Sequence, residues 1–189
     1  MKISNIALGL LTLFSLSQIS AFAIGSGSEE TNKTQLLSKI QGEKKIGELT
    51  TYQYQHLYFA AQPSEADLAE AKKAGIEIVI NLRAPSEYPY EEDKVAKKLG
   101  LKYYQVTFLK DGNIDPLSAL ELEKIHAAHP KTKQLIHCSS GNRAAAWFAT
   151  HLALKYHLSA DDSVEVASHL GLTKAEMQEK VKEHINKAN

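Results

Sequence analysis

One short run, LIHCSSGNRA, restricts the fold of this chain more than any other part of it. The mainly apolar stretch Gln134 to His137 predicts a buried strand, the small residues after Cys138 predict a tight loop, and a helical pattern begins at Arg143. A strand that ends in such a loop, next to a helix N-terminus, points several backbone N–H groups at one place. We therefore expect an anion-binding loop beside a thiol, in surroundings that favour the nucleophilic thiolate.

The rest of the chain alternates between strand-like and helix-like patterns, which predicts an α/β fold. An interrupted apolar run at 76–82 is typical of a strand covered on both faces. Ser64 with Asp67 fits a capping box at the start of a helix that Gly75 ends. We expect a mainly parallel, covered sheet of about four to five strands, followed by a helical C-terminal cap. The expected strands are 57–61, 76–82, 101–108 and 133–137, and the expected helices are 35–46, 64–75, 89–99, 115–128, 143–156, 159–170 and 173–187.

The N-terminal residues have the pattern of an export signal. Lys2 supplies a positive charge, residues 6–16 are mostly apolar, and residues 21–23, AFA, fit a cleavage site of small residues. The apolar core is shorter than a membrane span requires, although an uncleaved N-terminal anchor is the alternative. We expect cleavage after about Ala23, a flexible leader at 24–34, and one domain at 35–189. The mature chain is then a soluble periplasmic protein without stable membrane insertion.

The charge balance and the cysteine content exclude some classes of partner and cofactor. The 22 basic and 22 acidic side chains balance, and no basic stripe alternates with aromatic residues, so nucleic acid is not an expected partner. An exported chain with one cysteine cannot form an internal disulfide, so the thiol is free, reactive or shared with a partner. His126 and His129 lack an acidic partner at metal-site spacing. We expect neither a metal nor another cofactor.

The residues of the cysteine loop suit a phosphate or sulfate group. Ser139, Ser140 and Gly141 have little bulk, so their N–H groups can surround an anion, and we include Asn142 in this binding loop. Arg143 can add a guanidinium fork that bonds two oxygens of the anion. An inert buried cysteine in an ordinary turn is the alternative, and the polar loop argues against it.

Two residues at strand ends are candidates for supporting roles. His137 is expected to orient the loop by hydrogen bonding. Arg83 ends the expected strand 76–82 at the same sheet edge as Cys138. It either contacts the substrate or forms a structural ion pair with Glu87.

Residues 137–143, HCSSGNR, resemble the signature of cysteine-dependent tyrosine and dual-specificity phosphatases, in which five residues separate cysteine from arginine. The gap here is four, as in rhodanese sulfurtransferases and in a bacterial phosphatase-like group related to the domain of beta-lactamase-hydrolase-like proteins. The runs AQPSEADL at 61–68 and GIEIVINLR at 75–83, with Glu87 beyond, resemble the opening of that bacterial group. The resemblance covers about residues 57–172.

A rhodanese is the competing resemblance, because VINLRAPSEY at 79–88 is similar to a rhodanese stretch. A rhodanese, however, has another strand and a glycine pair after its active-site helix. The residues after Arg143 are helical patterns to the end, as in the dual-specificity phosphatase fold. The resemblance therefore implies the cysteine phosphatase (dual-specificity phosphatase-like) fold.

The resemblance also implies a reaction, the hydrolysis of a phosphomonoester, with phosphotyrosine among the candidates, in a phosphorylated protein or small molecule. Cys138 attacks phosphorus and forms a cysteinyl phosphate, while Arg143 and the loop N–H groups stabilise the oxygens. An aspartate on an upstream loop protonates the leaving oxygen. Asp111 is our first choice for this acid, whereas Asp115, which precedes a proline, fits a helix cap better.

The chain departs from the phosphatase pattern in two ways. Its loop is one residue shorter, and Ala144 stands where the family usually has a hydroxyl residue that helps the thiolate leave. Both departures lead us to expect slow turnover. Two other functions stay open, namely sulfur transfer through a Cys138 persulfide and non-catalytic binding of phosphate or sulfate.

Overall fold

A six-stranded mixed sheet forms the centre of the protein, in a computed structural model that describes residues 24–188. The export signal expected at residues 1–23 lies outside the described residues. The sheet order is β1-β2-β3-β8-β4-β5. The strands are β1 (Ile40–Ile46), β2 (Leu49–Tyr54), β3 (Leu57–Ala60), β4 (Ile78–Asn81), β5 (Lys102–Gln105) and β8 (Gln134–His137).

The inner strands are parallel, and this brings their carboxyl ends to one edge. Strand β8 pairs with β3 and with β4, and β4 pairs with β5, all in parallel. His137 at the end of β8 lies opposite Ala60 on one side and Asn81 on the other. The loops after β3, β4 and β8 therefore leave the sheet at the same edge, where ligands bind in folds of this kind.

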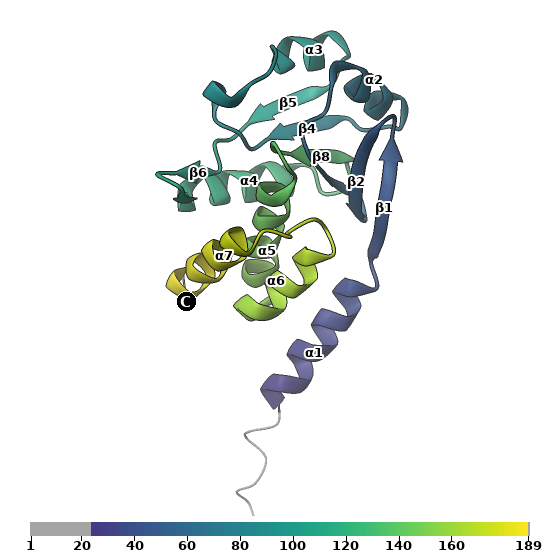
Figure 1. Cartoon of the computed structure of the whole chain (residues 1–189). Coiled ribbons are helices and arrows are strands. Elements are labelled where there is room, and N and C mark those ends of the chain that lie inside the picture. Colours follow the sequence, from purple (N-terminus) through teal and green to yellow (C-terminus); the bar gives the residue numbers. More distant parts are fainter. Residues whose placement is uncertain (1–23, 189) are drawn as a thin grey trace, which may run out of the picture.

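Seven α-helices accompany the sheet in the described residues. Figure 1 shows α2 (Glu65–Lys73) and α3 (Glu92–Lys98) on one face of the sheet. The other face carries α4 (Pro116–Ala128), α5 (Asn142–Tyr156), α6 (Ala160–Ser168) and α7 (Ala175–Ala188). Helix α1 (Ile24–Leu37) precedes β1 and contacts α6. The expected α/β fold with a covered sheet and a helical C-terminal cap is confirmed.

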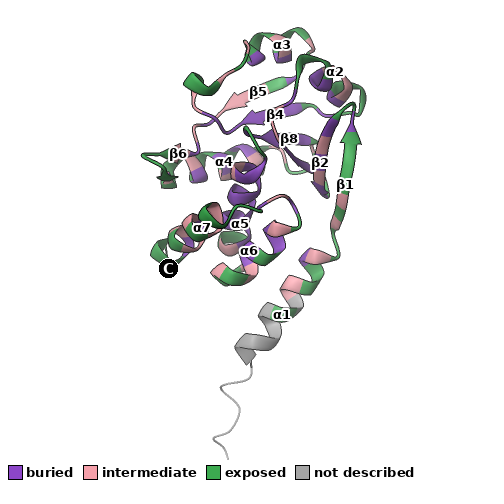
Figure 2. Ribbon diagram, viewed as in Figure 1, coloured by how far each residue is buried: buried purple, intermediate pink, exposed green. Residues whose placement is uncertain are grey.

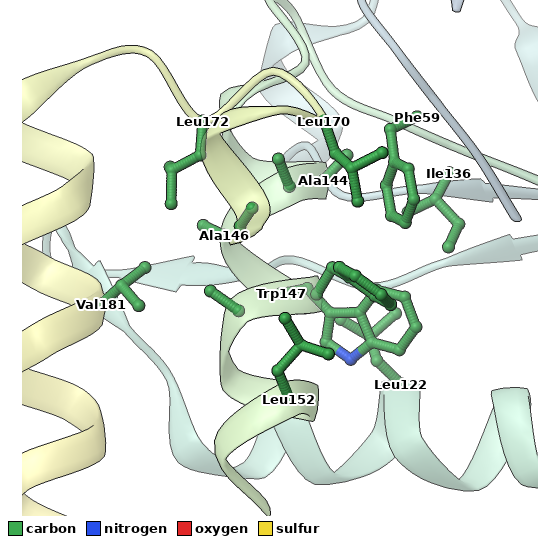
Figure 3. Close-up of a cluster of buried hydrophobic side chains, with 14 of the residues drawn as sticks. Phe59, Leu122, Ile136, Ala144, Ala146, Trp147, Leu152, Leu170, Leu172 and Val181 are labelled. Atoms are coloured by element: carbon green, nitrogen blue, oxygen red, sulfur yellow. The ribbon is translucent and has the colours of Figure 1, made fainter. Parts of the chain in front are cut away.

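Alternation along the strands sends side chains to two separate cores. Phe59, Ile80 and Ile136 belong to the larger core, under α4 to α7, while their neighbours Tyr58, Val79 and Leu135 belong to the smaller core, under α2 and α3. Strands β3, β4 and β8 are buried throughout, as Figure 2 shows. Figure 3 shows Trp147 of α5 within the larger core, surrounded by side chains from the sheet and from the other helices.

The helix starts follow the sequence signals. Ser64 and Asp67 form the expected capping box of α2, and the Ser159 side chain accepts from the N–H of Asp162 at α6. Asp115 caps α4 by accepting from two backbone N–H groups. No helix among the described residues is long and apolar enough to cross a membrane.

The N-terminal region differs from the prediction. The expected helix at 35–46 is wrong, because β1 occupies residues 40–46 and pairs antiparallel with β2. The segment expected to be a flexible leader is helical from Ile24. Two contacts hold this helix: Leu36 is buried in the larger core, and the Lys33 ammonium lies 2.8 Å from the Asp162 carboxylate on α6. These are long-range contacts, which a local pattern does not reveal.

Candidate active site

Cys138 is the first residue after β8 and is fully buried. Its backbone N–H donates to the carbonyl of Ala60, the last residue of β3, at 3.4 Å. Strand alternation turns its side chain toward the α4 to α7 face, whereas the side chain of His137 turns toward α3. The thiol therefore lies where β8 ends and α5 begins, as the sequence predicts.

The loop between Cys138 and α5 is tightly folded against β3. Gly141 has φ +85°, and a Cβ there would lie 3.4 Å from the backbone carbon of Ala60. Only glycine adopts this left-handed backbone at low cost. Ser140 forms a bridge with Ala61, which fixes the middle of the loop. The glycine thus lets the chain turn from β8 directly into the first turn of α5.

The Asn142 side chain bonds within the protein, whereas we expected Asn142 to belong to the anion-binding loop. Its Oδ1 atom accepts from the backbone N–H groups of Thr173 and Lys174, at 3.0 and 2.8 Å. The side chain therefore caps the start of α7 and ties α7 to the cysteine loop. What Asn142 can offer to an anion is its backbone N–H at the N-terminus of α5.

Arg143, in the first turn of α5, forms a two-pronged ion pair with Glu87. Its Nη1 and Nη2 atoms donate to the two carboxylate oxygens at 2.8 and 2.7 Å, and Nη2 also donates to the Ser139 hydroxyl at 3.0 Å. The bond from Arg143 lowers the pKa of Glu87 to about 2. The same bond, together with an interaction with Cys138, raises the pKa of Arg143. A phosphate or sulfate group that binds at this loop, in addition to the Glu87 carboxylate, meets a guanidinium that is already oriented.

A pocket of about 370 Å³ opens beside this pair. Ser139, Ser140 and Arg143 line it from the loop side, and Lys174 and Met177 line it from the region of α7. Two cationic side chains and the hydroxyl-bearing loop surround the space, as an oxyanion ligand requires, but the Glu87 carboxylate lines it too and competes for the guanidinium.

His137 has a partner that sequence reasoning missed. Its Nε2 atom lies 2.6 Å from Oε1 of Glu92 on α3, and both side chains are fully buried. The other oxygen of Glu92 accepts from the side-chain amide of Gln62 at 2.6 Å. A buried glutamate on a short surface helix is unusual. Glu92 directly follows an acidic residue in a charged run, so no sequence signal distinguished it from its exposed neighbours.

Arg83 does not form the ion pair with Glu87 that we offered as one alternative, since both oxygens of Glu87 bond Arg143. The Arg83 side chain is 3% exposed, and its guanidinium carbon lies 5.3 Å from the centre of the Tyr88 ring. Within the described residues, its Nε and Nη2 atoms are buried without a hydrogen-bond partner. Arg83 does not line the pocket, so its contact with a substrate stays a prediction.

The two candidate acids occupy different positions. Asp111 is exposed at the tip of a hairpin formed by β6 (Leu109–Lys110) and β7 (Asn113–Ile114). Its φ of +50°, with +77° at Gly112, fits a type I′ turn. Leu109 of the same hairpin lines the pocket, whereas Asp111 does not. The hairpin therefore adjoins the site without placing the carboxyl group in it.

Asp115 is a helix cap. The Ser118 hydroxyl donates to it at 2.7 Å and lowers its pKa, with further bonds from the N–H groups of Leu117 and Ser118. A carboxyl group held ionised in this way is poorly suited to donate a proton. No group of three or more potential metal ligands is found among residues 24–188.

Comparison with known proteins gives structural matches only, because no family model and no curated protein matches the chain. A candidate phosphatase of the DUF442 group from Shewanella putrefaciens matches at 18% identity and TM-score 0.60, covering 82% of this chain and 93% of that one. Kinase-associated phosphatase, with serine in place of its catalytic cysteine, matches at 19% identity and TM-score 0.60, covering 69% and 86%. The catalytic domain of the Saccharomyces cerevisiae PP-IP phosphatase SIW14, bound to citrate, matches at 20% identity and TM-score 0.55, covering 70% and 85%.

These matches show the fold of the chain. It is the fold of dual-specificity and tyrosine phosphatases, as the resemblance implied. After Arg143 the described chain contains only helices and their connections, so the additional strand expected of a rhodanese is not present in that part.

Proposed function

We propose that this chain is a cysteine-dependent phosphatase that hydrolyses phosphomonoesters through a cysteinyl-phosphate intermediate. The observation that carries the proposal is the placement of Arg143, which lines the pocket at the N-terminus of α5, at the end of the short loop that begins with the buried Cys138. A phosphoryl group bound there has a nucleophile at the buried end of the loop and positive groups around its oxygens. The shared fold with known phosphatases points the same way.

In the first step, the Cys138 thiolate attacks phosphorus, an S–P bond forms and the bond to the leaving oxygen breaks. The loop N–H groups and the Arg143 guanidinium stabilise the charge on the other phosphoryl oxygens. In the second step, water attacks the cysteinyl phosphate, the S–P bond breaks and inorganic phosphate is released. No metal or other cofactor takes part in either step as proposed.

The leaving oxygen needs a proton in the first step, and we keep Asp111 as the proposed donor. The hairpin that carries Asp111 adjoins the pocket through Leu109. A bend of this two-residue turn toward the site brings the carboxyl group to the substrate. Asp115 is unsuited to the role because its carboxylate accepts from the Ser118 hydroxyl and caps α4.

Slow turnover follows from the same residues. Ala144 is buried directly after Arg143 and offers no hydroxyl group to the leaving thiolate in the second step. The hydroxyl of Ser139, which accepts from Arg143 at 3.0 Å, or that of Ser140 is the candidate to supply that bond. We expect the second step to limit the rate.

The substrate and location are also proposals. The pocket takes a phosphate group of a protein or of a small molecule, and nothing in its lining indicates nucleic acid. We propose that the protein is exported and acts in the periplasm after cleavage near Ala23. Mass measurement of the mature protein from that compartment tests this, with an N-terminus near Ile24 expected and an uncleaved chain contradicting it.

One experiment separates this function from its competitors. Hydrolysis of p-nitrophenyl phosphate and sulfur transfer from thiosulfate to cyanide are measured for the wild type and for Cys138→Ser. Phosphatase activity that disappears in Cys138→Ser, while circular dichroism is unchanged, supports the proposal. Sulfur transfer without phosphatase activity supports the persulfide enzyme, and binding of phosphate without either reaction supports a non-catalytic anion-binding protein.

A further inference from the structure

A buried polar cluster lies on the opposite side of β8 from the thiol. Its members are Gln62, Glu92 and His137, and the name Glu92 cluster is used for them below. Alternation along the strands places Gln62 and His137 on the face covered by α2 and α3, at the carboxyl ends of β3 and β8. Glu92 enters from the start of α3. The cluster therefore lies directly behind the loop that carries Cys138.

The cluster holds the chain on both sides of the nucleophile. Glu92 bonds the ring of His137, the residue before Cys138, at 2.6 Å. It also bonds the side chain of Gln62, whose backbone N–H donates to the carbonyl of Ser139, the residue after Cys138, at 3.5 Å. A single carboxylate thus connects to both neighbours of the thiol.

The bonding pattern bears on which nitrogen of His137 carries the proton. One Glu92 oxygen accepts from Gln62 Nε2, and the other lies 2.6 Å from His137 Nε2. An imidazole that donates from Nε2 completes this bond. Its Nδ1 atom is buried and, within the described residues, has no hydrogen-bond partner.

We infer that Glu92 is a positioning residue, which acts through His137 and Gln62 to hold the loop around Cys138 in its anion-binding form. Small displacements of catalytic groups reduce rates strongly, so a group that fixes both flanks of the nucleophile affects the chemistry without touching the substrate. The inference rests on the proposed function for its kinetic consequence only. The structural consequences, which are the protonation state of the His137 ring and the reactivity of the Cys138 thiol, do not depend on the proposed function.

The test compares Glu92→Gln and Glu92→Ala with the wild type. The amide of Glu92→Gln keeps the size of the side chain but can donate as well as accept, so it no longer favours the proton on Nε2 of His137. The alanine variant removes both bonds. Glu123→Gln is the matched control, since Glu123 bonds His151 at 2.8 Å in a similar pair that does not touch the loop.

Three readouts are measured on folded protein. The first is the nitrogen-15 spectrum of the imidazole rings, the second is the rate of alkylation of Cys138 by iodoacetamide at pH 7, and the third is kcat and KM for p-nitrophenyl phosphate. We expect the wild-type ring to be protonated at Nε2 and the Glu92→Gln ring to lose this preference. We expect alkylation and kcat to fall at least tenfold in Glu92→Ala and less in Glu92→Gln, with Glu123→Gln within twofold of wild type.

A different result would contradict the role of Glu92 as a positioning residue. If both Glu92 variants lower only the melting temperature, and the ring state and the alkylation rate match those of Glu123→Gln, Glu92 merely holds α3 and the inference is wrong. Absence of phosphatase activity in the wild type contradicts the proposed function instead. The ring spectrum and the alkylation rate still decide the role of Glu92 in that case.

Discussion

Arg143 donates hydrogen bonds from both of its terminal nitrogens to the Glu87 carboxylate, at 2.8 and 2.7 Å, and it also interacts with Cys138. Glu87 is itself held, because one of its oxygens accepts from the backbone N–H of Ala84 at 2.9 Å. The pair therefore connects the short 3-10 turn η1 (Pro85–Glu87) to the first turn of α5 and fixes the orientation of the guanidinium. A phosphate that reaches this loop must share the guanidinium with Glu87 or displace it.

The first prediction concerns access to Cys138. In Glu87→Ala the guanidinium loses its anchor and the site gains one net positive charge, so the thiol becomes more exposed and more of it is thiolate. We expect iodoacetamide to alkylate Cys138 at least three times faster at pH 7. We also expect KM for p-nitrophenyl phosphate to fall, since the Glu87 carboxylate no longer competes for the guanidinium, and kcat to fall, since the arginine is less well positioned. The control is Glu70→Ala, which breaks an exposed pair with Lys73.

The second prediction concerns acid stability. Because the pKa of Glu87 is lowered to about 2 from 4.5, its ion pair stabilises the folded state fully above pH 4.5, and this stabilisation is lost as the pH falls toward 2. The Glu87 side chain is 38% exposed, so solvent screening reduces the contribution to about 1 kcal/mol. Urea unfolding of Glu87→Gln should show this deficit at pH 7. An equal deficit at pH 2.5 would contradict it.

The parallel part of the fold was predictable because its strands are buried on both faces. The mostly apolar run IEIVINL at 76–82 is too short for a buried helix, and the stretch KQLIH at 133–137 leads into a loop of small residues, so both indicate strands. Strand β1 was not predictable in this way. Its residues, IQGEKKI, are mostly exposed at the sheet edge, so no apolar alternation marks them. Pairing with β2, not local preference, makes this segment a strand.

The site residues likewise include some that the sequence pattern predicted and some that it did not. Cys138 and Arg143 lie in one continuous run, whose strand, loop and helix the sequence pattern specifies. Glu87 and Glu92 reach the loop from a separate segment, η1 and α3, and their partners are 56 and 45 residues away along the chain. Such long-range bonds depend on how the layers pack, which a single sequence does not reveal.

A third prediction tests the backbone of the loop. In Gly141→Ala, the added Cβ lies at contact distance from Ala60, 3.4 Å, and the left-handed backbone strains an alanine, which disturbs the loop around Cys138. We expect a loss of about 1 kcal/mol in stability and at least a tenfold loss in kcat/KM. Gly42→Ala is the control, because φ there is +73° with no atom within 4 Å of the added Cβ. It should lose similar stability and keep its activity, and a parallel loss of activity would remove the special role of Gly141.

A fourth prediction concerns His126, which lies between His56 and His151 and faces Trp147 and Gln134, with Glu123 near the cluster. Burial, with the charges of the two histidines, lowers the pKa of His126 to about 4 from 6.5. The unfolded chain therefore binds this proton more readily, and stability is lost as the pH falls from 6.5 to 4, by up to about 3 kcal/mol.

His126→Phe keeps an aromatic ring at this place and cannot be protonated. The free energy of unfolding of this variant should decline less between pH 7 and pH 4.5 than that of the wild type, in urea titrations at both pH values. His169→Gln, at an exposed position, should follow the wild type. Identical declines in the wild type and in His126→Phe would show that other groups cause the acid sensitivity.

The last prediction tests Asp111 as the proton donor. An acid matters most when the leaving oxygen is strongly basic, because a weakly basic phenolate departs without help. In Asp111→Asn, hydrolysis of aryl phosphates with poor leaving groups should slow at least tenfold, while that of p-nitrophenyl phosphate changes less. The measurement is the dependence of kcat/KM on leaving-group basicity across a series of aryl phosphates. Asp115→Ala is the comparison, since loss of the α4 cap should lower stability by about 1 kcal/mol and leave that dependence unchanged. A uniform effect of Asp111→Asn on all substrates would mean that the aspartate only forms the turn with Gly112, and that the proton comes from elsewhere.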